Sequence, residues 1–140
     1  MSSADLTAAL TPISRFLPAE PASVPAARRF VADALTGWRL PHLLDDATVC
    51  VSELVSNAVR HGSPPGRAIH LGLLPLLPAG LLRLEVGDDG PGVPRPRAPV
   101  ADDAIGGRGL LLVAALASAW GSEPRPLAGK VVWCEWEVPW

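Results

Sequence analysis

Proline and glycine constrain this chain more than any other feature of its sequence, because 16 prolines and 13 glycines make up 29 of its 140 residues. Both residues interrupt helices and strands, so the places where they cluster mark the joints between elements. The longest joint follows Asp88 and runs to Gly107, with prolines at positions 91, 94, 96 and 99. A loop of that length inside a compact domain usually serves a function.

Between these joints, the spacing of apolar residues predicts helices and strands. Apolar residues three and four apart are typical of helices buried on one face, and alternating ones are typical of strands. Helices are expected at 23–37, 41–62 and 107–119, and strands at 13–17, 69–73, 82–86, 120–125 and 130–138. Ser23 is expected to cap the first helix. This order predicts an α+β fold, a two-layer α/β sandwich with about three helices on one face of a mixed, mostly antiparallel sheet.

The chain is expected to form one domain over residues 11–140, after a flexible N-terminus at residues 1–10. Its formal net charge of −2 argues against direct nucleic-acid binding. No apolar stretch approaches the roughly 18 residues that cross a membrane, and the N-terminus lacks the features of a secretory signal. Cys50 and Cys134 stand apart from any Cys-x-x-Cys or histidine cluster, which favours a cytoplasmic protein with reduced thiols over a zinc site.

Three polar residues spaced four apart, Glu53, Asn57 and His61, interrupt the otherwise apolar helix expected at 41–62. On a helix they would form a stripe along one side, each about 6 Å from the next. Oxygen ligands of the Glu and Asn type suit Mg²⁺, which takes one or two protein ligands and completes its shell with phosphate and water. The alternative is that the stripe simply faces solvent.

An acidic, glycine-containing turn follows the strand expected at 82–86. Asp88 shares the parity of the inward-facing residues of that strand, so it is expected to point into the helix layer. Gly90 and Gly92 leave room for an approaching group, and the carboxylate can accept a hydrogen bond from an exocyclic amine such as that of adenine. The alternative is an ordinary turn, because Asp-Asp-Gly-Pro-Gly is well suited to one.

A glycine-rich segment, Gly106-Gly107-Arg108-Gly109, precedes the apolar run that begins at Leu110. Backbone N–H groups at a helix N-terminus bind anions, and Arg108 adds a charged donor. The segment has neither the Gly-Lys-Ser/Thr of a Walker loop nor the preceding strand of a Rossmann fingerprint. Alone it does not identify a phosphate site.

Taken in order, these three segments resemble the ATP-binding fold shared by gyrase, heat-shock protein 90, histidine kinases and MutL. The resemblance covers residues 11–138. The sequences SELVSNAVRH at 52–61, DDGPGVP at 88–94 and GRGL at 107–110 look most like the small single-domain anti-sigma factor serine kinases of bacteria. The Ala-, Pro- and Arg-rich composition is similar to that of proteins from high-GC actinobacteria.

The resemblance implies a role for each motif residue. Asn57 would bind Mg²⁺ at the phosphates of ATP, Glu53 would be the general base, and Asp88 would accept a hydrogen bond from the adenine amine. Further nucleotide contacts would come from the glycines and their neighbours on both sides of the long loop: Gly90, Gly92, Gly107, Arg108, Gly109 and Leu110. His61 would steady the polar stripe or approach the nucleotide, and a structural role is left open.

The expected function is phosphoryl transfer from Mg-ATP to a partner protein, as in an anti-sigma factor serine/threonine-protein kinase. The implied partners are an anti-sigma factor antagonist, a sigma factor or both. A homodimer is a further option, with Trp133, Trp136 and Trp140 as candidate contacts. Trp136 shares the parity of the inward-facing residues of its strand, which favours core packing, so Trp133 on the opposite face is the better candidate. The alternative function is a non-catalytic, ATP-dependent module that sequesters a sigma factor or another regulator without using Glu53. A stand-alone ATPase of the gyrase type is disfavoured, because those chains carry a further domain that completes the site.

Overall fold

The computed structural model describes residues 10–64, 67–90, 104–125 and 129–140, with the backbone alone at 104–108. Five strands form one sheet in the order β1-β2-β3-β5-β4, and every neighbouring pair is antiparallel. The strands are β1 (Ile13–Pro18), β2 (Ala68–Leu76), β3 (Leu81–Asp88), β4 (Ala119–Pro124) and β5 (Lys130–Glu137). The sequence predicted a mixed, mostly antiparallel sheet, but the described sheet is antiparallel throughout. The reason is that β5 lies between β3 and the edge strand β4 and runs antiparallel to both.

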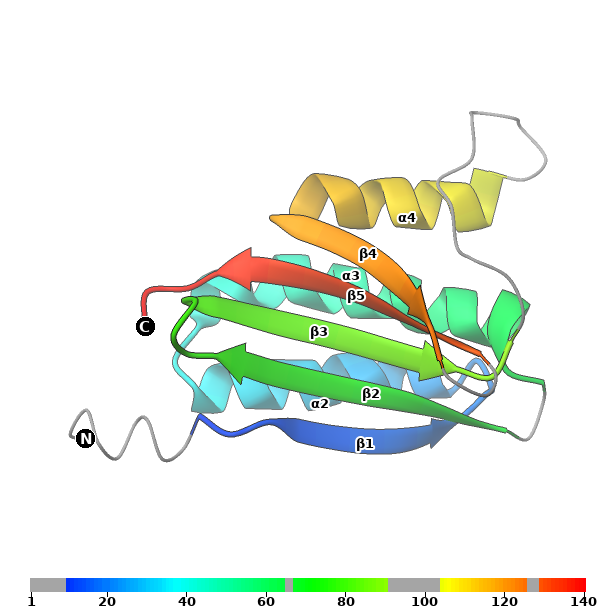
Figure 1. The fold of residues 1–140 in the computed structure, drawn as a ribbon. Helices are drawn as coiled ribbons and strands as arrows, with labels where there is room; N and C mark the ends of the chain where they lie inside the picture. Colours follow the sequence, from blue (N-terminus) through cyan, green and yellow to red (C-terminus); the bar gives the residue numbers. More distant parts are fainter. Residues whose placement is uncertain (1–9, 65–66, 91–103, 126–128) are drawn as a thin grey trace.

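Three α-helices of the described chain cover one face of this sheet (Figure 1). They are α2 (Ser23–Gly37), α3 (Leu44–Asn57) and α4 (Ala104–Leu116), with a 3-10 turn at Pro41–Leu43 before α3 and a π-helical turn, η2 (Ala58–Gly62), after it. α3 packs against both α2 and α4. The two-layer α+β sandwich predicted from the sequence is confirmed. Within the described ranges, no helix has the length and apolar character needed to cross a bilayer.

The hydrophobic core lies between the helices and the inward-facing residues of the sheet. Alternate residues of β2 and β3 are each at most 1% exposed: Ile69, Leu71, Leu73, Leu82, Leu84 and Val86. Burying an aliphatic side chain of this size stabilises a fold by roughly 1.5–3 kcal/mol. The alternation continues to the end of β3, and this continuation directs position 88 toward the helices.

Both cysteines lie in this core as free, buried thiols. Burial, reinforced by the neighbouring Cys50, raises the pKa of the Cys134 thiol well above its usual range. The thiolate is the reactive form of cysteine, so these residues act as small hydrophobic side chains.

The start of α2 differs from the cap expected at Ser23. The N-cap is Ala22, and Ser23 is the first helical residue. Its buried hydroxyl donates a hydrogen bond to the carbonyl of Pro18 at 2.5 Å. Ser23 therefore ties α2 to the end of β1 instead of satisfying the helix's own N–H groups.

α4 begins and ends three residues earlier than the 107–119 expected from the sequence. Gly106–Gly109 consequently lie within its first two turns rather than ahead of it. A glycine inside a helix costs about 1 kcal/mol relative to alanine. The helix forms there because Leu110 and Val113 are buried against the rest of the core.

Candidate functional site

The residues singled out in the sequence gather at one end of the sandwich. There α3 and its π-helical turn end, β3 ends, and β5 and α4 begin (Figure 1). η2 packs against β3, and α3 packs against α4. Two sets of residues can be distinguished at this end. The Asp88 group consists of Asp88, Lys130, Gly62 and Gly90, and the Glu53 group consists of Glu53, Asn57 and Gly109.

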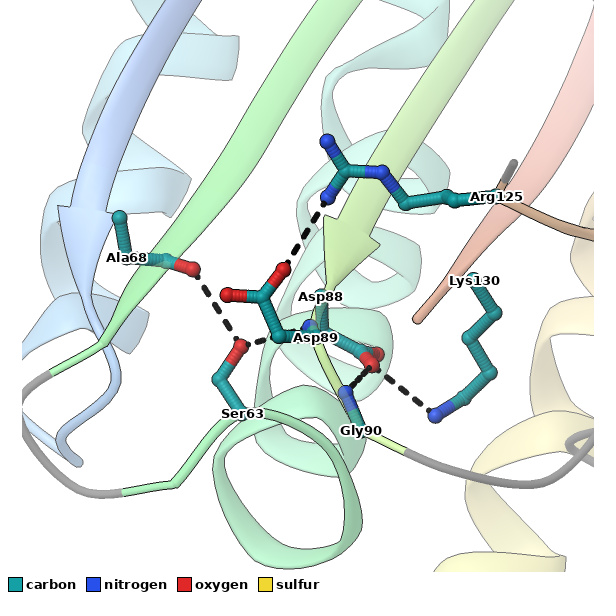
Figure 2. Close-up of polar contacts among 7 residues, drawn as sticks. All are labelled: Ser63, Ala68, Asp88, Asp89, Gly90, Arg125 and Lys130. Atoms are coloured by element: carbon teal, nitrogen blue, oxygen red, sulfur yellow. Dashed lines mark hydrogen bonds and ion pairs between the residues drawn. The ribbon is translucent and has the colours of Figure 1, made fainter. Parts of the chain in front are cut away.

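Asp88 ends β3 with its side chain buried in the helix layer, and the residue is only 2% exposed. Its Oδ1 accepts hydrogen bonds from the backbone N–H of Gly90 at 2.8 Å and from Nζ of Lys130 at 3.0 Å (Figure 2). Lys130 stands directly opposite Asp88 in the register of β3 and β5, so both side chains leave the sheet on the same face. A buried carboxylate is thus paired with a buried ammonium group.

Gly62 and Gly90 bring two backbone segments into direct contact beside this carboxylate. A Cβ on Gly90 would overlap the Cα, carbonyl carbon and oxygen of Gly62. A Cβ on Gly62 would lie 2.6 Å from Cγ and 2.7 Å from Oδ2 of Asp88. Only glycine fits at either position without displacing its neighbours. The end of the polar helix and the acidic turn therefore form one packed unit.

A further set of polar contacts holds the turn that follows Asp88. The buried hydroxyl of Ser63 accepts a hydrogen bond from the N–H of Asp89 at 3.0 Å and donates one to the carbonyl of Ala68 at 3.3 Å. The exposed Asp89 forms an ion pair with Arg125, with Nη1 3.6 Å from Oδ1 (Figure 2). Exposed pairs contribute about 0–1 kcal/mol, so the Ser63 contacts fix the turn more firmly than the ion pair does.

The predicted polar stripe is regular only in its first half. Glu53 and Asn57 lie one turn apart on α3, and both are half-buried. His61 is exposed and belongs to η2, where the π-helical hydrogen bonding interrupts the α-helical spacing. Among the described residues, none forms a hydrogen bond or ion pair with these three side chains. Glu53 and Asn57 therefore keep polar atoms available to water or a ligand.

The start of α4 meets this stripe at Gly109. A Cβ on Gly109 would lie 2.6 Å from Oε2 of Glu53. Both Gly109 and the next residue, Leu110, are buried. The unpaired N–H groups at the start of a helix are those of the N-cap and the first three helical residues, and in α4 the helical ones belong to residues 104–106. Gly107 and Gly109 follow them, and Gly109 contacts Glu53.

Some predicted site residues cannot be placed in this geometry. Gly92 lies outside the described residues, and so does the side chain of Arg108, so their roles stay predictions.

Of the tryptophans considered as dimer contacts, Trp136 is buried in the core and donates a hydrogen bond to the carbonyl of Leu116 at 2.9 Å. Trp133 lies on the opposite face, where the Arg83 guanidinium stacks 4.5 Å from its ring centroid.

Sequence reasoning missed three members of this site: Gly62, Ser63 and Lys130. A signal for Lys130 was present, because it shares the parity of the core residues Val132 and Cys134 and therefore had to face inward. No comparable signal marked Gly62 or Ser63. Their importance depends on the approach of η2 to β3, which is a tertiary contact.

The chemistry of the site suits a nucleotide better than a metal centre built from protein ligands. Within the described ranges, no group of three or more His, Cys, Asp or Glu side chains could hold a metal ion. Asn57 could hold Mg²⁺ only together with ligand oxygens, as at many phosphate sites. The helix N–H groups suit phosphate, and the buried carboxylate suits an amino group. The residues present therefore fit a magnesium-bound nucleotide.

The fold and this site define a class of protein, the two-layer α+β nucleotide-binding domains. The family model described as the histidine kinase-like ATPase domain matches residues 17–136, which run from the end of β1 almost to the end of β5. The chain therefore belongs to the histidine kinase-like ATPase domain family and is an ATP-binding domain. A search of curated proteins gave no match.

Proposed function

We propose that this protein is a regulator that uses Mg-ATP to phosphorylate a serine or threonine of a partner protein, as anti-sigma factor kinases do. The observation that carries the proposal is the contact between Glu53 and Gly109, which places a half-buried carboxylate against the start of α4. Fully buried carboxylates are normally paired, whereas a half-buried one can keep its oxygens open to water or a ligand. No partner for Glu53 exists in the described part of the chain, so the carboxylate is available to accept a proton.

Each residue of the site would have one task in this reaction. Glu53 would accept the proton of the attacking hydroxyl, while the hydroxyl oxygen bonds to the γ-phosphorus and the bond to the β-phosphate oxygen breaks to release ADP. Asn57 would hold Mg²⁺, which neutralises charge on the phosphates. The N–H groups of residues 104–106 would donate hydrogen bonds to phosphate oxygens. Asp88 would accept a hydrogen bond from the adenine amino group.

The proposed partners are an anti-sigma factor antagonist that carries the hydroxyl, and a sigma factor that the protein sequesters, in the cytoplasm. Support for this role comes from the sequence form of residues 52–61 and 88–94. If the protein forms a homodimer, Trp133 is the better contact candidate, because Trp136 is buried in the core.

Calorimetric titration with Mg-ATP and Mg-ADP tests the nucleotide site directly. We expect micromolar binding that Asn57→Ala weakens. Ser56→Ala is the matched control, because Ser56 is half-buried on the same helix but lies outside the polar stripe. Absence of binding to the unmodified protein, or equal loss in both variants, would contradict the proposal.

The second candidate function is a non-catalytic module that binds its partner in an ATP-dependent manner. It is favoured by the Asp88 group, whose hydrogen bonds and packing do not involve Glu53. Glu53→Ala separates the two functions. Loss of partner phosphorylation with intact ATP binding supports the kinase, whereas persistent phosphorylation shows that Glu53 is not the base.

A further inference from the structure

One charged residue of the Asp88 group has no task in the function proposed above. Lys130 is the first residue of β5 and is only 8% exposed. Lysine is almost never buried to this extent unless it is paired. Its pairing with Asp88 explains how the ammonium group is tolerated, but not why a lysine is present. The backbone N–H of Gly90 already donates to the same oxygen of the carboxylate.

The ammonium group of Lys130 offers more donors than its surroundings use. It carries three N–H donors and no acceptor. In the described part of the chain its one hydrogen-bond acceptor is Oδ1 of Asp88, at 3.0 Å. A buried donor without an acceptor is costly. The remaining N–H groups find no acceptor among the described residues and can donate to water or a ligand. Both of the donors that reach Asp88 bind Oδ1, and Oδ2 accepts no hydrogen bond from the described residues.

We propose that Lys130 determines the base preference of the nucleotide site by donating a hydrogen bond to N1 of adenine while Asp88 accepts one from the adjacent 6-amino group. This inference rests on the ATP site proposed above. The carboxylate can only accept and the ammonium can only donate, and the two lie side by side in the structure. Adenine presents the complementary pair, a donor beside an acceptor, on one edge. Guanine presents the two in the opposite order.

A purely structural role for Lys130 makes a different prediction. If the ammonium only neutralises Asp88, its removal weakens all purine nucleotides alike. If it bonds N1, its removal abolishes the preference for nucleotides that carry N1. The informative quantity is therefore the ratio of two affinities rather than either affinity alone.

The test compares ATP with 1-deaza-ATP, in which a C–H group replaces N1 and the 6-amino group is kept. Both are titrated with Mg²⁺ into the unmodified protein, Lys130→Met and Arg125→Met. Arg125 is the matched control, because it is a neighbouring cation that pairs with the exposed Asp89. We expect the unmodified protein and Arg125→Met to prefer ATP by about tenfold or more, the usual contribution of a charged hydrogen bond. We expect Lys130→Met to bind both nucleotides equally.

Two results would overturn the inference: an unchanged preference in Lys130→Met, or equal binding of the two nucleotides by the unmodified protein. The second comparison needs no variant, so it stands even if Lys130→Met fails to fold. Lys130→Gln keeps an N–H donor without the charge and should retain part of the preference for ATP. If the unmodified protein binds neither nucleotide, the proposed ATP site itself is wrong, which is a distinct result.

Discussion

The two halves of the candidate site are built in opposite ways. In the Asp88 group, the carboxylate is buried, accepts two hydrogen bonds and is enclosed by two glycines that admit no side chain. In the Glu53 group, the carboxylate and the amide of Asn57 are half-buried and have no partner among the described residues. In the proposed function, this difference means that base recognition is organised before the nucleotide binds, whereas Glu53 and Asn57 would acquire their partners from the nucleotide.

We call the Asp88 group the organised half of the site and the Glu53 group the open half. The largest effect on stability is expected where the organised half loses its charge balance. Asp88→Asn leaves the buried ammonium of Lys130 without a counter-charge, and removal of one member of a buried pair costs about 3–5 kcal/mol. ATP binding should be lost as well. Asp89→Asn is the control, because its exposed pair with Arg125 contributes about 0–1 kcal/mol. Urea unfolding measures both, and equal midpoints would show that the Asp88 group is not held by this pair.

Packing in the organised half should be the next most sensitive feature. Gly62→Ala places a methyl group 2.6 Å from Cγ of Asp88, a carboxylate that Lys130 and Gly90 hold in place. Overpacking of this kind costs about 1–3 kcal/mol, and the displaced carboxylate should no longer bind ATP. At Gly37 an added Cβ meets nothing within 4 Å, so Gly37→Ala should change the free energy of unfolding by less than about 0.5 kcal/mol. A similar small change for Gly62→Ala would mean that the organised half can relax.

The two halves also differ in how far the sequence alone predicts them. Spacing along one helix placed Glu53 and Asn57 correctly on α3, and strand parity correctly turned Asp88 inward. These inferences are local, because each depends on the period of a single element. The contact between Gly62 and Gly90 depends on how η2 meets β3, and no local pattern encodes that approach.

The remaining differences have the same origin in tertiary packing. The α-helical period predicted a continuous stripe to His61, but the last turn before Gly62 is π-helical. The glycines at 106–109 indicated a loop ahead of a helix, yet the helix already begins at Ala104 because its apolar face packs on the core. Local propensity was overridden in both places by the packing of neighbouring elements.

Removal of Mg²⁺ should weaken nucleotide binding through the open half, the Glu53 group, and leave the Asp88 group unchanged. Chelation with EDTA is expected to weaken ATP binding, because the phosphates lose the cation that Asn57 would hold. The preference for ATP over 1-deaza-ATP should persist, since it depends on the Asp88 group. The melting temperature without nucleotide should also stay the same, because the described residues offer no cluster that could hold the metal by itself. A lower melting temperature in EDTA would reveal a structural metal ion and contradict this division.

The smallest effect on stability is expected from Gly109→Ala in the Glu53 group, although the new methyl group meets a carboxylate as closely as in Gly62→Ala. In Gly109→Ala the new methyl group would also lie 2.6 Å from a carboxylate, that of Glu53. Glu53 can swing away, because no described residue holds its carboxylate, and alanine favours a helix over glycine by about 1 kcal/mol. The free energy of unfolding should therefore stay level or rise slightly.

Partner phosphorylation, in contrast, should fall in Gly109→Ala, because the carboxylate is displaced from the start of α4. ATP affinity should change little. The double variant Gly109→Ala, Glu53→Gln provides the control: adding the alanine where the base is already absent should reduce transfer no further. If Gly109→Ala instead destabilises the fold as much as Gly62→Ala does, then Glu53 is held as firmly as Asp88. The contrast between an organised and an open half would then be wrong.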